Sequence, residues 1–167
     1  MFFVSVNHCD ALQLLVERQN YASAFALLRP TFENSFRAVW LNKCANESQV
    51  EKAIQKADWP PVRNLIESIE EHTKQSKLFS ILWSKLKTFA HDFTHGGIQL
   101  AGRHISENGV ITPHISQKEI ELLLEISVLV STYILGEFIE LSGDKRALPL
   151  FEKLVNETNQ WLFAKAC

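Results

Sequence analysis

The sequence predicts an all-α helical bundle of about six to seven helices around a four-helix core. Apolar residues recur at three- and four-residue steps along nearly the whole chain, and capping residues precede several of these stretches. No segment alternates apolar and polar residues as a half-buried strand would. The composition is 46% hydrophobic with 11 Phe but only 6 Gly and 5 Pro, which is typical of a globular domain. We expect one domain covering residues 1–167, since a chain of this length can bury its own core.

The first half of the chain predicts two long helices. The first is expected to begin near Asp10 and to end before Asn20. The second runs from about Tyr21 to Cys44, with one apolar stripe that consists of Phe25, Leu28, Phe32, Phe36 and Val39. Pro30 lies inside this helix and removes one backbone hydrogen bond, so we expect a kink there or two helical pieces packed end to end.

Shorter helices are expected in the middle of the chain. The motif from Ser48 to Glu51 has the pattern of a capping box and predicts the start of a third helix. Trp59-Pro60-Pro61 should end that helix and open the next one near Val62. A further apolar stripe runs from Ser76 to about Thr94 and stops at Gly96-Gly97. Turn residues predict a mobile loop at residues 104–115.

The helix at residues 117–142 is apolar on two sides and begins with a second capping box, Ser116 to Glu119. One side carries Ile120, Leu123, Leu124, Ser127, Ile134 and Phe138, and the other carries Leu122, Ile126, Leu129 and Tyr133. Such a helix is either central in the bundle or shared with a second subunit. We expect a homodimer through this helix. An amphipathic last helix should follow the break at Gly143-Asp144.

Charge and cysteine content restrict the functional class. A formal net charge of −2 gives no general attraction to nucleic acid, so an RNA-binding role would need a local basic patch. Cys9, Cys44 and Cys167 show no paired spacing, which favours reduced thiols and a cytoplasmic protein. The first residues lack the basic leader of a signal peptide. The most apolar run, Ile126 to Leu135, is shorter than the ~20 residues that cross a bilayer, so we expect no membrane association.

Charged residues at helical spacing form the first candidate site. On a helical wheel Arg29 falls within the arc of the apolar stripe, and Glu33 and Arg37 lie progressively toward its edge. A buried guanidinium cannot lose its charge and needs a carboxylate, for which Glu33 is nearest. The three residues therefore form either a functional cluster that binds a small anionic ligand or a ladder of surface ion pairs.

Two histidines form the second candidate site. His91 and His95 lie four residues apart, so both occupy one face of a helix near its end. Such a pair could bind a divalent metal if Glu33, Asp92 or His104 supplied a third ligand. It could also transfer protons without a metal, or pack and cap the helix. The chain has no phosphate-binding or dinucleotide fingerprint, and we expect neither cofactor nor metal.

With Arg29-Pro30, Glu33, Arg37, Trp40-Leu41 and Thr94-His95-Gly96-Gly97, the chain resembles a family of uncharacterised bacterial all-helical proteins, from about Tyr21 to Glu140. That family is distantly similar to HEPN-like bundles, several of which are ribonucleases in toxin and defence systems. Ribonuclease members carry an arginine followed after about four to six residues by a histidine. The nearest pair here is Lys87 and His91, with lysine in place of arginine and a shorter spacing.

This resemblance implies specific roles for the candidate residues. His91 or His95 would act as general base toward a ribose 2′-hydroxyl, Arg29 or Arg37 would stabilise the phosphate charge, and Glu33 would orient them. We favour a noncatalytic interaction or regulatory module whose Arg/Glu/His cluster binds a small anion or fixes packing. The alternative is a HEPN-like, metal-independent ribonuclease of a toxin or phage-defence type, so whether the protein is an enzyme stays open. Convergence of these side chains in one cleft would discriminate the two.

Overall fold

The structure is a computed structural model that describes residues 1–95 and 115–163, without the side chains of 88–92, 94, 95 and 163. Its elements confirm the all-α bundle, because the described chain contains seven α-helices, one short 3-10 helix and no strand. The helices are α1 (Phe2–Glu17), α2 (Tyr21–Lys43), α3 (Glu47–Lys56), α4 (Val62–Thr73), α5 (Leu78–His95), α7 (Gln117–Ser142), η1 (Lys145–Ala147) and α8 (Leu148–Phe163). The loop expected at residues 104–115 lies outside the described residues, except for its last residue.

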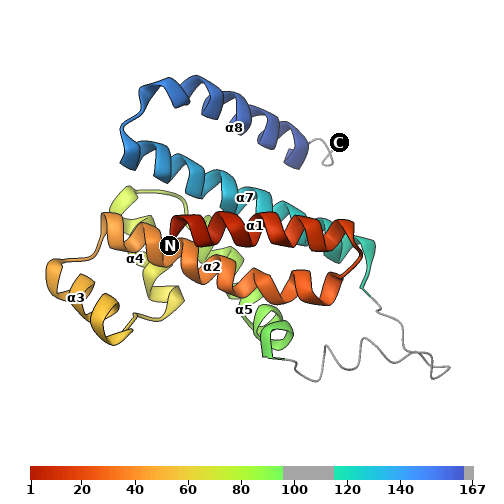
Figure 1. The fold of residues 1–167 in the computed structure, drawn as a ribbon, viewed down its shortest axis with the longest axis horizontal. Helices are drawn as coiled ribbons and strands as arrows, with labels where there is room; N and C mark the ends of the chain where they lie inside the picture. Colours follow the sequence, from red (N-terminus) through yellow and green to blue (C-terminus); the bar gives the residue numbers. More distant parts are fainter. Residues whose placement is uncertain (96–114, 164–167) are drawn as a thin grey trace.

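Helix α2 is central in this arrangement. It packs against α1, α4, α5 and α7, whereas α8 packs mainly against α7 and η1. Figure 1 shows α8 on the outer side of α7, with α1 and α2 on the other side. The bundle therefore has a core formed around α2 and one outer helix, α8, that covers part of α7.

Aromatic rings on α2 fix its neighbours. The ring centroids of Phe25 and Phe93 lie 4.8 Å apart, and those of Phe36 and Phe79 lie 5.1 Å apart. Because Phe25 and Phe36 belong to α2 while Phe79 precedes Phe93 along α5, the two helices run antiparallel. The end of α5 that contains His91 and His95 consequently lies beside the first turns of α2.

Helix α2 continues through Pro30 as one 23-residue helix, so the expected division into two pieces is wrong, whereas the alternative of a kink within one helix stays a prediction. Two hydroxyl groups just after the proline form hydrogen bonds with carbonyl groups one turn earlier. Thr31 Oγ1 donates a hydrogen bond to the Leu27 carbonyl, and Ser35 Oγ donates one to the Thr31 carbonyl, both at 2.6 Å. Burial of the α2 stripe against α5 and α7 offsets the backbone hydrogen bond that Pro30 cannot make.

Two helix starts differ from the sequence-based expectation. Helix α1 begins at Phe2 and not near Asp10, because Phe2 packs edge-on against Phe138 of α7 with centroids 6.2 Å apart. Helix α3 is capped by Asn46 and not by Ser48. The backbone amide of Gln49 donates a hydrogen bond to Asn46 Oδ1 at 3.0 Å. The backbone amide of Asn46 donates one to Gln49 Oε1 at 2.9 Å. The capping box at Ser116 is confirmed.

Helix α7 lies inside the bundle between α8 on one side and α1 and α2 on the other, which is one of the positions that its two apolar sides allow. Ile120, Leu123, Ile126, Val130 and Ile134 are buried in the bundle, and part of the second side faces α8 of the same chain. Within the described residues, α7 is also the one helix that is long and apolar enough to cross a membrane. Core helices of soluble proteins pass the same test, so this property is weak evidence.

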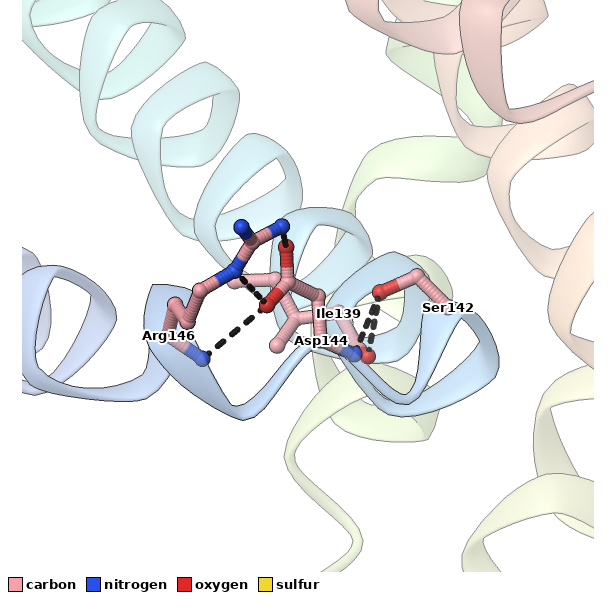
Figure 2. A network of polar contacts seen from close by, with 4 residues as sticks. All are labelled: Ile139, Ser142, Asp144 and Arg146. Carbon is pink, nitrogen blue, oxygen red and sulfur yellow. Dashed lines mark hydrogen bonds and ion pairs between the residues drawn. The ribbon is translucent and has the colours of Figure 1, made fainter.

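A compact polar turn joins α7 to α8 (Figure 2). Gly143 ends α7 in the left-handed conformation, with φ of 66°. Asp144 accepts hydrogen bonds from the backbone amide and guanidinium of Arg146 at 3.0 and 2.8 Å, and these bonds lower the pKa of its carboxyl. The Asp144 amide donates to Ser142 Oγ at 3.2 Å. This network fixes the reversal that returns α8 along α7.

Candidate functional site

The predicted residues Arg29, Glu33 and Arg37 lie on successive turns of α2 and form one chain of ion pairs, called here the arginine ladder. Arg29 Nε donates to Glu33 Oε1 at 2.8 Å, and the Arg37 guanidinium lies 3.3 Å from Glu33 Oε2. Their side chains are 28%, 19% and 26% exposed, respectively. The ladder is thus partly buried at the edge of the apolar stripe, as the helical wheel indicates.

The ladder carries more positive than negative charge. Two guanidinium groups share one carboxylate, so the three residues have a net charge of +1. The Arg37 guanidinium lies 5.2 Å from the ring centroid of Trp59, which follows α3 just before Pro60. Arg37 Nε is buried without a hydrogen-bond partner. An anion bound here would neutralise the surplus charge, and the Trp59 ring holds Arg37 in place.

The structure shows which helix carries the two predicted histidines. Their convergence with the arginine ladder stays a prediction. His91 and His95 belong to the last turns of α5, and their side chains lie outside the described part of the chain. Phe93, between them, packs on Phe25, one turn before Arg29 on α2. Among the described residues, no group of three potential ligands could hold a metal ion. The side chains of His91, Asp92, His95 and His104 lie outside the described part of the chain, so the absence of such a group does not extend to them.

A second polar cluster joins α2 to α7 and was missed by the sequence analysis. We call it the lysine cluster: Lys43, Glu137, Glu140 and Tyr133. Lys43 Nζ lies 3.0 Å from Glu137 Oε2 and 2.9 Å from Glu140 Oε2. Burial alone would lower the pKa of Lys43, but hydrogen bonds to Glu140 and Glu137 and their negative charges raise it above its ordinary value. The lysine is therefore held in its charged form.

Tyr133 lies beside Glu137 at the inner end of this cluster. Its ring packs against Phe79 and Phe36, with centroids 4.8 and 6.2 Å away. The hydroxyl group is buried beside the Glu137 carboxylate and interacts with it, although the contact does not have the geometry of a full hydrogen bond. Burial, and next the charge of Glu137, raise the pKa of Tyr133 above its usual value. The phenol is thus kept neutral and available for a hydrogen bond.

A cavity of about 520 Å³ adjoins the lysine cluster. It lies between α7, α8 and the connection from α4 to α5, and Tyr133, Glu137 and Glu140 form part of its wall. Thr132 and Thr158 bring their hydroxyl oxygens to 3.5 Å across α7 and α8. A Cβ on Gly136 would lie 2.7 Å from Phe151 Cζ, so this glycine permits the close packing of α8.

The arginine ladder offers a direct measurement of what partial burial adds to an ion pair. Arg63 and Glu67 form the same Nε to Oε1 pair at 2.7 Å, with side chains 73% and 48% exposed. We expect a double-mutant cycle on Arg29→Gln and Glu33→Gln to give a coupling of about 1 kcal/mol in urea unfolding. The matched cycle on Arg63→Gln and Glu67→Gln should give a clearly smaller coupling, because solvent screens this exposed pair. Equal couplings would contradict the inward position of the ladder.

The Tyr133 phenol should lose its proton at a higher pH than an exposed tyrosine. The chain has two tyrosines, and we expect the absorbance of native protein at 295 nm to show a phenol step above pH 10 that Tyr133→Phe removes. Since the folded protein favours the neutral phenol, its contribution to stability is complete below about pH 10 and is lost as the pH rises further. Glu137→Gln should move the step to lower pH. A step that survives in Tyr133→Phe would disprove the assignment.

Comparison with known proteins gives a family without a described activity. A family model described as a family of unknown function (DUF6988) matches residues 2–162. No curated protein matches the chain. No solved structure matches it either. Because the match covers nearly the entire chain, the protein belongs to the DUF6988 family, a family of unknown function.

Proposed function

We propose that this protein is a noncatalytic interaction module that works as a homodimer, in which the second copy covers exposed apolar residues of α1, α7 and α8. The observation that carries the proposal is the concentration of such residues on these helices: Phe3, Val4, Val6 and Leu14 on α1, Leu122, Phe138 and Leu141 on α7, and Leu148, Leu150, Leu154 and Trp161 on α8. On the other described helices, only Ile54, Leu78 and Ile81 are large, apolar and exposed. Exposed apolar residues that gather on neighbouring helices are typical of interaction sites.

Helix α8 supplies the most distinctive part of this surface. Phe151, Val155, Thr158 and Leu162 face the cavity beside α7. Leu150, Leu154 and Trp161 form a second stripe, about a quarter turn around the helix, and are 73%, 36% and 39% exposed. Asn159, on the cavity side, lies opposite this stripe. The apolar face of α8 is consequently only half covered by its own chain.

A second copy fits this half-covered face. An antiparallel pair of α8 helices related by a two-fold axis would bring Leu150 of each copy toward Trp161 of the other, which is the self-complementary contact that such an axis requires. Phe3 is 73% exposed and stacks edge-on against Phe138, with centroids 5.7 Å apart, at the end of the molecule where α8 begins (Figure 1). A net charge of −2 gives little repulsion between copies.

Light scattering tests the homodimer. We expect the parent protein to dimerise and the Leu150→Glu, Leu154→Glu variant to dissociate to 19.1 kDa, with affinity reduced at least tenfold, because each copy would bury two charges in the contact. Ile54→Glu is the matched control, since Ile54 is 70% exposed on α3, and it should leave the dimer intact. A parent that stays at 19.1 kDa up to high micromolar concentration would refute the proposal.

A ribonuclease is the second candidate, favoured by the surplus positive charge of the arginine ladder beside the end of α5. In this alternative Arg29 or Arg37 would bind the phosphate group. His91 or His95 would remove the proton of a ribose 2′-hydroxyl. The reaction would need no metal, as in the HEPN-like enzymes that the chain resembles. Glu33 would orient the two guanidinium groups.

Incubation with mixed cellular RNA in chelator separates the two candidates. We expect the parent and a His91→Ala, His95→Ala variant to leave the RNA equally intact, because an interaction module has no catalytic group to lose. Cleavage by the parent with loss of cleavage in the variant would replace the noncatalytic proposal by the ribonuclease. Circular dichroism of the variant, compared with the parent, verifies that both are folded.

A further inference from the structure

We propose that the cavity between α7, α8 and the connection from α4 to α5 is a binding site for a small organic amine with an apolar body. This proposal does not require the homodimer, because the cavity and the exposed stripe of α8 lie on different sides of that helix. A volume of about 520 Å³ is within the usual range of small-molecule sites, about 300–1,000 Å³. The site is formed by three separate segments of one chain.

The two ends of the cavity differ in chemistry. Phe79, Leu129, Phe151, Val155 and Leu162 supply an apolar wall. Tyr133, Glu137 and Glu140 supply polar groups from the second half of α7. An apolar wall with a few convergent polar groups is the usual composition of a ligand site, in which the wall binds the body of the ligand and the polar groups set its orientation.

The net charge of the lysine cluster favours a positively charged ligand. Among the described residues, Lys43 is the one cation paired with Glu137 and Glu140, so these three side chains have a net charge of −1. Lys43 contacts one oxygen of each carboxylate. Glu137 is only 5% exposed and its charge is compensated by Lys43, so the surplus negative charge lies on the more exposed Glu140 beside it. A ligand ammonium group would bring the cluster to neutrality, whereas a carboxylate or phosphate would be repelled.

Hydrogen bonding points to the same ligand class. The buried Tyr133 hydroxyl lies close enough to Glu137 to interact with its carboxylate, but its oxygen accepts no hydrogen bond from the described residues, which leaves an acceptor for a ligand. An ammonium group has three donors and no acceptor. It can therefore donate to Tyr133 and to a carboxylate at once, while its apolar body packs against Phe79 and Phe151. Neither a neutral apolar molecule nor an anion satisfies both groups.

Three probes of the same shape test this inference: 2-phenylethylamine, 2-phenylethanol and phenylacetate. We expect titration calorimetry to show millimolar or tighter binding of the amine, at least tenfold weaker binding of the alcohol and none of the carboxylate. Amide NMR shifts on adding the amine should concentrate at Thr132, Gly136 and Thr158. Equal binding of amine and alcohol, no binding of the amine, or shifts confined to other helices would overturn the proposal.

Substitutions of the polar cavity residues Tyr133, Glu137 and Glu140 test whether the amine binds in the cavity. Glu137→Gln should lower the affinity for the amine at least tenfold, because it removes a charge. Tyr133→Phe should lower this affinity about threefold, because it removes a hydrogen bond. Glu140→Gln is the variant least able to disturb folding, since Glu140 is 70% exposed, and it should also weaken binding. Glu51→Gln, on the distant helix α3, is the matched control and should bind as the parent does. Unchanged affinity in both Glu137→Gln and Glu140→Gln would overturn the proposal.

Discussion

The aromatic stripe of α2 is the contact on which the other features of the molecule depend. Phe25, Phe32 and Phe36 are at most 2% exposed and meet aromatic rings of α5, and Phe36 also approaches Tyr133 of α7. Burial of each such side chain contributes about 2–3 kcal/mol relative to exposure. These contacts hold α5 antiparallel to α2 and fix α7 against α2 at Tyr133. Burial of the stripe also stabilises α2 through Pro30.

The same packing determines how far each charged group is removed from water. Arg29 lies close to the stripe and is 28% exposed, whereas Arg63, in an equivalent pair on α4, is 73% exposed. Lys43 is 14% exposed because α7 covers it at the end of α2. Charge pairs at such partly buried positions interact more strongly than pairs in water, yet they keep access for a ligand. Both polar clusters are therefore consequences of where α2 meets its neighbours.

Local features of the sequence predicted much of this arrangement. Three- and four-residue apolar spacing predicted most of the helices correctly, and i,i+4 spacing predicted the pairing of Arg29 with Glu33, because both depend on a single helix. The ion pair between Lys43 and Glu140, 97 residues apart, depends on how two helices pack and has no local signal. The start of α1 was missed for the same reason, since Phe2 is ordered by Phe138. The outer side of α7 was predicted to be shared with a second subunit, and α8 of the same chain covers part of it.

Helix α8 connects the two proposals physically. Its inner face lines the cavity and its outer stripe is exposed, while the turn at Asp144 and Arg146 fixes its first end to α7. Within the described chain it packs mainly on α7. An amine in the cavity would order α8 from within, and a second copy would order it from outside. Because both would stabilise the same position of one helix, each would favour the other, which is the condition for coupling between ligand binding and assembly.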